Sequence, residues 1–407
     1  MRPYAGRRVL LGVSGGIASY KAAWLARLLS LAGAEVDVVM TRAATEFVGP
    51  VTFEALTGRP VHTDIFAPGR ALDHVKLPRS ADSIIVAPAT ADFMARAAHG
   101  QADDLLSACL LAAGDPRAGG PPVLLVPAMN DRMWQHPQTI RNVAALRELG
   151  YDVLDPATGM LAAGEGSGPG RMPEPEAILI YAGRALEREG SLAGQHILVT
   201  AGPTREPVDP VRFLSNRSSG KMGIAIAAAA WRRGAEVTLI AGPLEVPAPG
   251  GVTVVTVETT DEMARTVRSA LPKANALIMA AAPADYRSVS PSESKIKRTG
   301  AALTVEFAPT PDILVETRDA RRPGAVVVGF ALETGGALAS GRRKLVAKTL
   351  DLVVVNDARD EGAGFGVDTN RVTLLWPDGR VEPLPLMPKT ELADVLLDRV
   401  GALLNAG

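Results

Sequence analysis

The chain has 407 residues, which favours two domains that are each long enough to bury a full core. Hydrophobic residues make up 47% of it, beside 40 glycines and 31 prolines, as in α/β globular proteins and unlike disordered or fibrous chains. Its 43 Lys and Arg balance 44 Asp and Glu, which disfavours nucleic-acid and membrane partners, and its single cysteine, Cys109, excludes an intramolecular disulfide and suits a cytoplasmic location.

The first half begins with a strand over residues 9–13, a tight Ser14-Gly15-Gly16 turn and a helix that ends at Gly33. We expect the buried face of that helix to consist of Ile17, Tyr20, Trp24, Leu28 and Leu31. Three more buried strands are expected at 36–40, 84–87 and 123–126. Thr41, PATAD (88–92) and PAMN (127–130) follow their carboxyl ends, where open α/β sheets bind ligands.

The Gly-rich turn is GVSGG and not G-x-G-x-x-G, and no acidic residue is placed to hold an adenosine ribose. This pattern disfavours a nicotinamide-dependent reductase. The hydroxyls of Thr41 and Thr90 at neighbouring strand ends suit a flavin phosphate and the edge of an isoalloxazine ring. Taken alone, His74 is better interpreted as an ordinary loop or helix-start histidine, whereas Asn130, just past a strand, could bind a carboxylate or an amide.

Several motifs of the first half resemble the flavin-containing cysteine decarboxylases: His74, PATAD, DDLLS (103–107), PAMNDRMW (127–134) and GPGRMPEP (168–175). The resemblance is strongest to the amino-terminal half of the bifunctional phosphopantothenoylcysteine decarboxylase and phosphopantothenate–cysteine ligase family of coenzyme A synthesis. It implies FMN, held around Ser14, Gly15, Thr41, Thr90 and Ser107, which oxidises the substrate thiol before carbon dioxide leaves. It also implies that His74 is the active-site base, that Asn130 holds the departing carboxylate, and that FMN lies between subunits of a trimer.

The chain departs from this pattern at one place. The family carries a protonating cysteine in a loop, in a context like QACG or LACG, where this chain has LAAG with Ala163. Three interpretations stay open: a substitute donor such as Glu165 or water, release of an enethiol without reduction, or a domain impaired in the reductive step and kept as an FMN scaffold. Cys109 stands elsewhere and is interpreted as a buried apolar residue.

The boundary between the halves is expected at Gly190-Ser191, after a helix over 176–189, giving domains 1–190 and 191–407. The second half opens with a strand at 197–200, a polar loop rich in proline, and a helix from Ser219-Gly220 to Gly234. GAEVDVVM at Gly33 returns as GAEVTLIA at Gly234, so the chain is predicted to hold two Rossmann-like units in tandem. SSGKMG lacks the P-loop spacing, but the helix start after it can face an anion.

Further strands are expected at 237–241, 252–256, 276–280, 326–328 and 352–355, then a hairpin over 372–384 and a helix after Thr390. Asp285 follows one strand and could bind a ribose, a base or magnesium, or cap a helix. Lys295 belongs to a basic loop, KIKR, of a kind that is usually solvated surface. Lys344 and Lys348 lie one helical turn apart and could bind successive phosphates or face solvent.

The second half resembles the ligase half of the same bifunctional family, in the CTP-using form. The matching segments are AGPTREPVDPVRFLSNRSSGKMG, AAPADYR, KIKR, PTPDIL and VGFALET, in this order. The resemblance implies that Arg212, Asn216 and Lys295 act on an acyl-cytidylate intermediate and that magnesium, with Asp285 as a candidate ligand, lies near the CTP phosphates. It also implies CTP contacts at Ala281, Asp285, Lys295, Pro311, Asp312, Ile313, Leu314, Phe330, Lys344 and Lys348.

Together these observations predict an α/β protein of two tandem Rossmann-like three-layer domains, a flavodoxin-like flavin decarboxylase domain and a nucleotide-binding ligase domain. The expected function is CTP-dependent ligation of 4′-phosphopantothenate to cysteine, followed by FMN-dependent decarboxylation to 4′-phosphopantetheine. The alternative is an active ligase fused to an FMN-binding domain impaired in reduction. A homo-oligomer is expected, with trimeric decarboxylase contacts, dimeric ligase contacts and a dodecamer as one candidate.

Overall fold

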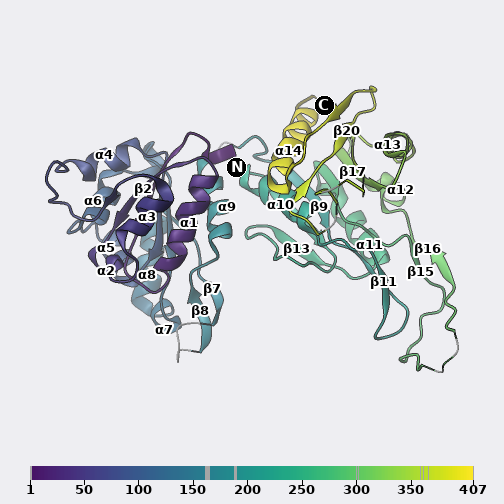
Figure 1. The fold of residues 1–407 in the computed structure, drawn as a ribbon, viewed down its shortest axis with the longest axis horizontal. Helices are drawn as coiled ribbons and strands as arrows, with labels where there is room; N and C mark the ends of the chain where they lie inside the picture. Colours follow the sequence, from purple (N-terminus) through teal and green to yellow (C-terminus); the bar gives the residue numbers. More distant parts are fainter. Residues whose placement is uncertain are drawn as a thin grey trace. The chain divides into compact units, whose positions relative to one another are not determined.

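The computed structural model describes residues 2–160, 166–187, 190–298, 300, 302–357, 359–360, 362–364 and 366–406. The chain divides into two compact units, Met1–Arg188 and Glu189–Gly407, and each is described by itself (Figure 1). Among the described residues, no helix has both the length and the apolar character needed to cross a membrane.

The first unit is built on a six-stranded parallel sheet with strand order β3-β2-β1-β4-β5-β6. This is the Rossmann order 3-2-1-4-5-6, so the expected Rossmann-like α/β layer is confirmed. The order reverses between β1 and β4, and open α/β sheets bind their ligands outside the carboxyl ends of the strands at such a point. The strands are β1 (Arg8–Val13), β2 (Glu35–Met40), β3 (Val61–His62), β4 (Ser83–Ala89), β5 (Val123–Pro127) and β6 (Asp152–Val153).

Helices cover both faces of this sheet (Figure 1). One core cluster lies under α1 (Ser19–Leu31), α3 (Pro50–Thr57) and α9 (Pro175–Leu186). The other lies under α5 (Ala91–Ala98), α6 (Leu105–Ala112) and α8 (Pro137–Glu148). The short helices α2 (Arg42–Thr45), α4 (Asp73–Ser80) and α7 (Asp131–Trp134) and the hairpin of β7 (Ala157–Met160) and β8 (Ser167–Arg171) lie among the loops.

The expected buried face of α1 is wrong. Ile17, just before the helix, and Tyr20 are 68% and 61% exposed, and Trp24 and Leu31 are exposed too. The residues that face the sheet are Ser19, Lys21, Ala22, Leu25, Ala26 and Leu29. Both stripes are apolar with helical spacing, and the one with smaller side chains lies against the sheet, so periodicity alone could not choose between them.

The second unit has an eight-stranded sheet with order β13-β12-β9-β14-β17-β18-β20-β21. Its first six strands are parallel in the Rossmann order, and β20 and β21 add the expected antiparallel hairpin. The central strands could be predicted from the sequence because each is a continuous apolar run. The strands are β9 (His196–Ala201), β12 (Glu236–Ala241), β13 (Thr253–Thr256), β14 (Ala276–Met279), β17 (Val326–Glu333), β18 (Leu352–Asp357), β20 (Thr373–Leu375) and β21 (Val381–Pro383).

The helices of the second unit divide between the two faces of the sheet. A right-handed crossover from β9 to β12 and another from β17 to β18 run in opposite directions along the sheet, so α10 and α13 lie on opposite faces. A shared core joins α11 (Thr260–Ala270), α12 (Ile313–Glu316) and α13 (Ala337–Ala347) on one face. On the other, α10 (Lys221–Arg232) packs against the last helix, α14 (Lys389–Ala406).

Two antiparallel ribbons project from this unit and were not predicted. One pairs β10 (Arg205–Pro207) with β11 (Phe213–Ser215), within the segment expected to be a loop, and the other pairs β15 (Tyr286–Ser288) with β16 (Phe307–Pro309). They contact each other and form a projection, which we call the arm, and Figure 1 shows it leaving the body of the unit. A third small pair is β19 (Thr369–Asn370) with β22 (Met387–Pro388).

Candidate functional sites

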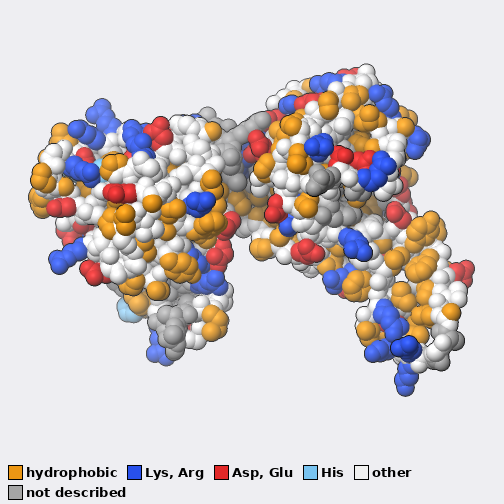
Figure 2. Space-filling view, in the orientation of Figure 1, with side chains coloured by type: hydrophobic (Ala, Val, Ile, Leu, Met, Phe, Trp, Pro, Cys, Tyr) orange, Lys and Arg blue, Asp and Glu red, His pale blue; other side chains and the backbone are white. Residues whose placement is uncertain are grey.

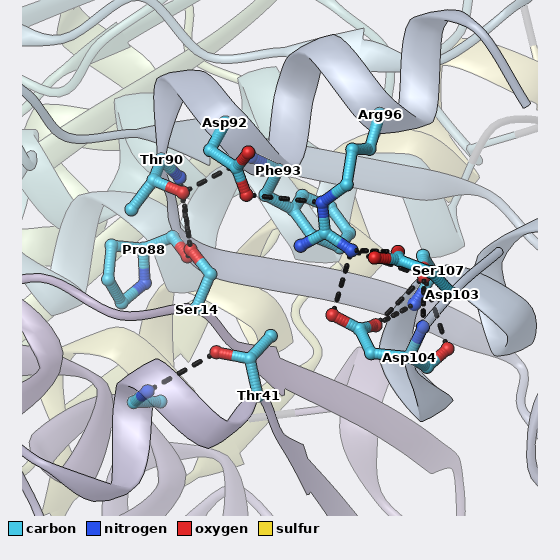
Figure 3. A network of polar contacts seen from close by, with 11 residues as sticks. Ser14, Thr41, Pro88, Thr90, Asp92, Phe93, Arg96, Asp103, Asp104 and Ser107 are labelled. Carbon is cyan, nitrogen blue, oxygen red and sulfur yellow. Dashed lines mark hydrogen bonds and ion pairs between the residues drawn. The ribbon is translucent and has the colours of Figure 1, made fainter. Parts of the chain in front are cut away.

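The crevice of the first unit is lined by the turn after β1 and the start of α5. Ser14 is buried, and its hydroxyl donates to the Pro88 carbonyl at 2.8 Å and accepts from the Thr90 backbone N–H at 3.0 Å (Figure 3). A Cβ added at Gly15 would lie 2.4 Å from the Cβ of Ala43, so only glycine allows this close approach of the turn to α2. The residues at the β1 and β4 ends therefore meet as predicted from their strand positions.

The hydroxyls of Thr41 and Thr90 cap short helices. Each accepts a hydrogen bond from a backbone N–H in the first turn, of Ala44 in α2 and of Phe93 in α5. A capping hydroxyl uses a lone pair and keeps its O–H as a donor, so both remain able to bind a phosphate or carbonyl oxygen. Ser107 differs, because its hydroxyl already forms a capping box with Asp104 and is 2% exposed.

Arg96 is the centre of a polar network that the sequence reading did not identify (Figure 3). Its guanidinium contacts Asp103 at 2.6 Å, Asp104 at 2.8 Å and Asp92 at 3.1 Å. Burial acts to lower the pKa of Arg96, but the hydrogen bonds of Asp104 and Asp103 outweigh it and raise the pKa. The network ties α5 to the first turn of α6, and thereby fixes the strand ends that flank the crevice.

His74 lies half-buried in α4, and its Nδ1 atom is buried without a partner among the described residues. The neighbouring carboxylate, Asp73, is paired with His62 at 2.8 Å instead. A ring nitrogen without a hydrogen-bond partner keeps a lone pair or a proton available, and a general base or acid needs this before its substrate binds.

Asn130 caps α7 through its Oδ1 atom, which accepts from the Arg132 N–H at 2.9 Å. This orients the amide so that its Nδ2 donors have no partner in the described part of the chain, and they can meet a carboxylate. The β7–β8 hairpin packs beside it, since a Cβ at Gly170 would lie 2.2 Å from the Met129 carbonyl oxygen. Ala163 and Glu165 fall between these strands and lie outside the described residues.

Cys109 is fully buried in α6, as expected. Burial, with the Asp73 and Asp104 charges next, raises the pKa of this thiol to about 12. It is therefore a neutral packing residue and not a thiolate nucleophile.

The second unit contains a cavity of about 540 Å³ at the carboxyl ends of its central strands. Most of the residues predicted for CTP line it, together with Asn216, so segments far apart in sequence meet as their strand positions predict. The predicted residues in its wall are Asn216, Ala281, Asp285, Pro311, Asp312, Ile313, Leu314, Phe330, Lys344 and Lys348. Arg212 and Lys295 are not among the lining residues.

Charges in this cavity are largely paired. Lys344 contacts Glu333 at 3.0 Å, and Lys348 contacts Asp312 at 2.9 Å, so both ammonium groups point inward and not to solvent. Burial acts to raise the pKa of Glu333, but Ser340 and Lys344 outweigh it and lower the pKa. The Asp285 carboxylate is exposed, has no side-chain partner among the described residues and caps no helix.

Asn216 joins the arm to the end of β14. Its Nδ2 atom donates to the carbonyls of Ala282 at 3.2 Å and Pro283 at 2.9 Å. Both amide hydrogens are therefore engaged, and donation to an intermediate requires this loop to shift.

Arg212 and Lys295 lie together on the arm. Buried Asp209 accepts from the backbone N–H groups of Arg212 at 2.8 Å and of Ile296, next to Lys295, at 3.1 Å. Burial acts to raise the pKa of Asp209, but these backbone donors lower it below its usual range. The charged carboxylate thus organises the arm, a role that the sequence alone did not indicate.

The sequence reading also missed several polar residues in the cavity wall. Lys221 begins α10 and Lys389 begins α14, and the rest include Ser218, Asn356 and Asn370. Lys221 directly follows the Ser219-Gly220 helix start that was expected to face an anion. This position was the sequence feature that could have identified Lys221 as a site residue. Within the described residues, no group of three or more His, Cys, Asp and Glu side chains is arranged to hold a metal ion.

Comparisons with known proteins agree with the division of the chain into two units. A family model described as Flavoprotein matches residues 1–184, and one described as the DNA/pantothenate metabolism flavoprotein C-terminal domain matches residues 192–403. The coenzyme A biosynthesis bifunctional protein CoaBC of Mycobacterium tuberculosis (strain ATCC 25618 / H37Rv) is 48% identical, over 97% of this chain and 96% of that protein. That of Bacillus subtilis (strain 168) is 43% identical, over 98% and 97%. A crystal structure of the C-terminal domain of a CoaBC protein is 37% identical, covers 54% of this chain and all of that one, and has a TM-score of 0.45.

Proposed function

This chain belongs to the family of coenzyme A biosynthesis bifunctional proteins CoaBC, and from that premise we propose how its two domains divide the work. It is an enzyme with phosphopantothenoylcysteine decarboxylase and phosphopantothenate–cysteine ligase activities. Residues 1–190 carry the decarboxylation and residues 191–407 the ligation. The observation that supports the ligase assignment best is the single cavity shared by Asn216, Phe330 and Lys344.

Ligation requires activation of a carboxylate, which is a poor electrophile until one of its oxygens becomes part of a leaving group. CTP supplies that group when the carboxylate attacks its α-phosphorus, forming an acyl cytidylate and releasing pyrophosphate. Attack of the cysteine amine then forms the amide and releases CMP. Lys344 and Lys348 hold the triphosphate by exchanging Glu333 and Asp312 for phosphate oxygens.

Phe330 and the segment 311–314 border the base, because they line the same cavity as these lysines. Asp285 would hold magnesium beside the CTP phosphates, because its free carboxylate fits the preference of that cation for one or two protein oxygens beside phosphates and water. Asn216 lies in the cavity wall where the arm begins, and there it contacts the acyl intermediate. These roles explain why an exposed acidic side chain stands in a cavity of lysines.

Lys295 and Arg212 act in the site of a second copy of the chain. They do not line their own cavity, and the arm that carries them exposes apolar side chains, including Phe213, Tyr286 and Phe307. Exposed apolar surface on a projecting ribbon is typical of a subunit interface. Lys295 then reaches the intermediate from the partner and stabilises the oxyanion of the amide-forming step.

The residues of the first unit fit a flavin. The tight turn at Gly15 and the free O–H groups of Thr41 and Thr90 suit the FMN phosphate and the edge of its ring. The Nδ1 atom of His74, which has no partner among the described residues, suits a base beside the flavin. FMN supplies the oxidation that places the carboxylate β to a C=S group, from which carbon dioxide leaves readily. His74 takes the substrate proton, and the Asn130 amide holds the carboxylate. Ser107 acts through the capping box that shapes this edge.

The exposed stripe of α1 supports oligomerisation of this domain. Ile17, Tyr20 and Trp24 form a continuous apolar surface beside the Ser14 turn, and Trp24 also donates to Glu176 at 2.9 Å. We assign it to the contact between copies that completes the flavin site, as in a trimer. With the dimeric contacts of the arm, this gives a homo-oligomer in the cytoplasm.

The alternative of a decarboxylase domain impaired in the reductive step is not favoured, because relatives named as bifunctional match nearly the whole chain. One incubation tests both activities: phosphopantothenate, cysteine and CTP, with and without FMN, followed by mass spectrometry. We expect phosphopantothenoylcysteine, CMP and pyrophosphate without FMN, and 4′-phosphopantetheine with it. An enethiol product with bleached flavin would restore the alternative, and absence of CMP would refute the ligase assignment.

A further inference from the structure

Arg321 is a half-buried arginine beside the ligase cavity. It follows the short 3-10 turn Arg318–Ala320 and is not among the residues that line the cavity. Its guanidinium donates to the backbone carbonyl oxygens of Leu314 at 2.7 Å, Thr349 at 2.8 Å and Lys348 at 3.1 Å. Its Nε–H is buried and has no acceptor among the described residues.

The contacts of Arg321 are to neutral carbonyls, and within the described part of the chain it forms no ion pair. Burial, and next the Arg318 charge, lower its pKa, while the Asp351 charge opposes the shift. Hydrogen bonds from a charged donor are stronger than those between neutral groups. The carbonyls that Arg321 contacts are therefore held more firmly than a neutral side chain could hold them.

These carbonyls belong to two elements that the proposed function assigns to CTP. Lys348 and Thr349 lie at the end of α13, where backbone carbonyls find no partner within the helix and a positive charge is favourable. Leu314 lies in α12, within the segment 311–314 assigned to the base. Arg321 thus joins the helix end that carries the phosphate-binding lysines to the base-binding segment.

A second link between the same two elements lies in the cavity wall, where the Lys348 ammonium contacts the Asp312 carboxylate at 2.9 Å. In the function proposed above this ammonium exchanges Asp312 for a phosphate oxygen, so binding of the triphosphate breaks the link. The contacts of Arg321 are made outside the cavity wall and with backbone carbonyls, and no such exchange removes them.

We propose that Arg321 is a positioning residue of the ligase, which keeps the segment 311–314 at a fixed distance from the end of α13 once CTP has broken the Lys348–Asp312 pair. This inference rests on the ligase function proposed above. Base and triphosphate belong to one ligand, so their two subsites must keep the separation that this ligand requires, and shifts of about 1 Å are costly. Cytidine has no phosphate and leaves the Lys348–Asp312 pair intact, so its binding depends less on Arg321.

The test is calorimetric titration of the full chain with CTP and with cytidine, in the presence of magnesium and without the other substrates. In Arg321→Met we expect the Kd for CTP to rise at least about tenfold and the Kd for cytidine less than about threefold. Arg321→Lys keeps a charged donor that can reach some of the carbonyls, and should recover part of the CTP affinity. The matched control is Arg318→Met, which removes an exposed guanidinium that donates to the Ala347 carbonyl of α13, and should change neither Kd.

An equal loss of affinity for both ligands, as a general loss of structure would produce, would overturn the proposal, and so would an unchanged Kd for CTP. If Arg321→Met does not fold, the same comparison of CTP with cytidine in Arg321→Lys decides. A wild-type chain that binds no CTP would instead refute the ligase function itself, and this inference with it.

Discussion

Asp394 of α14 accepts a hydrogen bond at 2.8 Å from Arg233, the residue that follows α10, and both side chains are almost fully buried. Arg232, also buried, pairs with the same carboxylate. The carboxylate therefore fixes α14 against α10.

We expect Asp394→Asn to destabilise the ligase domain by about 3–5 kcal/mol, because it removes a buried negative charge that pairs with two buried guanidinium groups. Urea unfolding followed by circular dichroism measures this change. Asp398→Asn removes a partner of Arg233 that is 29% exposed, and should cost about 1 kcal/mol. Equal effects of the two substitutions would show that burial does not govern this network.

Replacing Asn216 by Ala should permit formation of the acyl cytidylate but block the amide. The side chain holds the carbonyls of Ala282 and Pro283 at the cavity wall, and we expect amide formation to fall by about 10²–10³. Rapid quench with mass spectrometry should detect the accumulated intermediate. Ser215→Ala removes a neighbouring loop hydrogen bond, to the Thr204 carbonyl, outside the cavity wall, and should keep most of the activity. A wild-type amide yield in Asn216→Ala would refute the role.

Much of the ligase site followed from strand order. Asp285, Phe330 and Asn216 could be placed together because parallel strands bring their carboxyl ends to one edge of a sheet, whatever the sequence separation. The roles at CTP came from the resemblance and not from spacing. Lys389 was not identified, since nothing local marks a lysine at the start of a helix as buried.

The elements that were predicted wrongly or not at all also have physical explanations. The ribbons of the arm are three-residue strands with proline and polar side chains, which carry no period-two signal. The buried face of α1 was wrong because Tyr20 and Trp24 suggested a core, whereas a subunit interface selects the same residue types. A hydrophobic pattern alone does not distinguish these two settings.

Arg96→Met should weaken FMN binding and lower the stability of the first domain. The substitution frees Asp103 and Asp104 from their shared guanidinium and loosens the first turn of α6, at a cost of about 1–3 kcal/mol. We expect FMN to bind about tenfold more weakly, measured by flavin fluorescence. Arg147→Met breaks an exposed pair with Asp155 and should change stability by less than about 0.5 kcal/mol. Unchanged FMN affinity in Arg96→Met would exclude a positioning role.

Cys109 should not react with thiol reagents in the native protein. Its pKa of about 12 leaves on the order of 10⁻⁵ of it as thiolate at neutral pH, and no part of the side chain is exposed. A disulfide exchange reagent should label it once per chain only after unfolding. Cys109→Ala should retain decarboxylation, and loss of the saturated product in that variant would identify Cys109 as the proton donor that Ala163 does not supply.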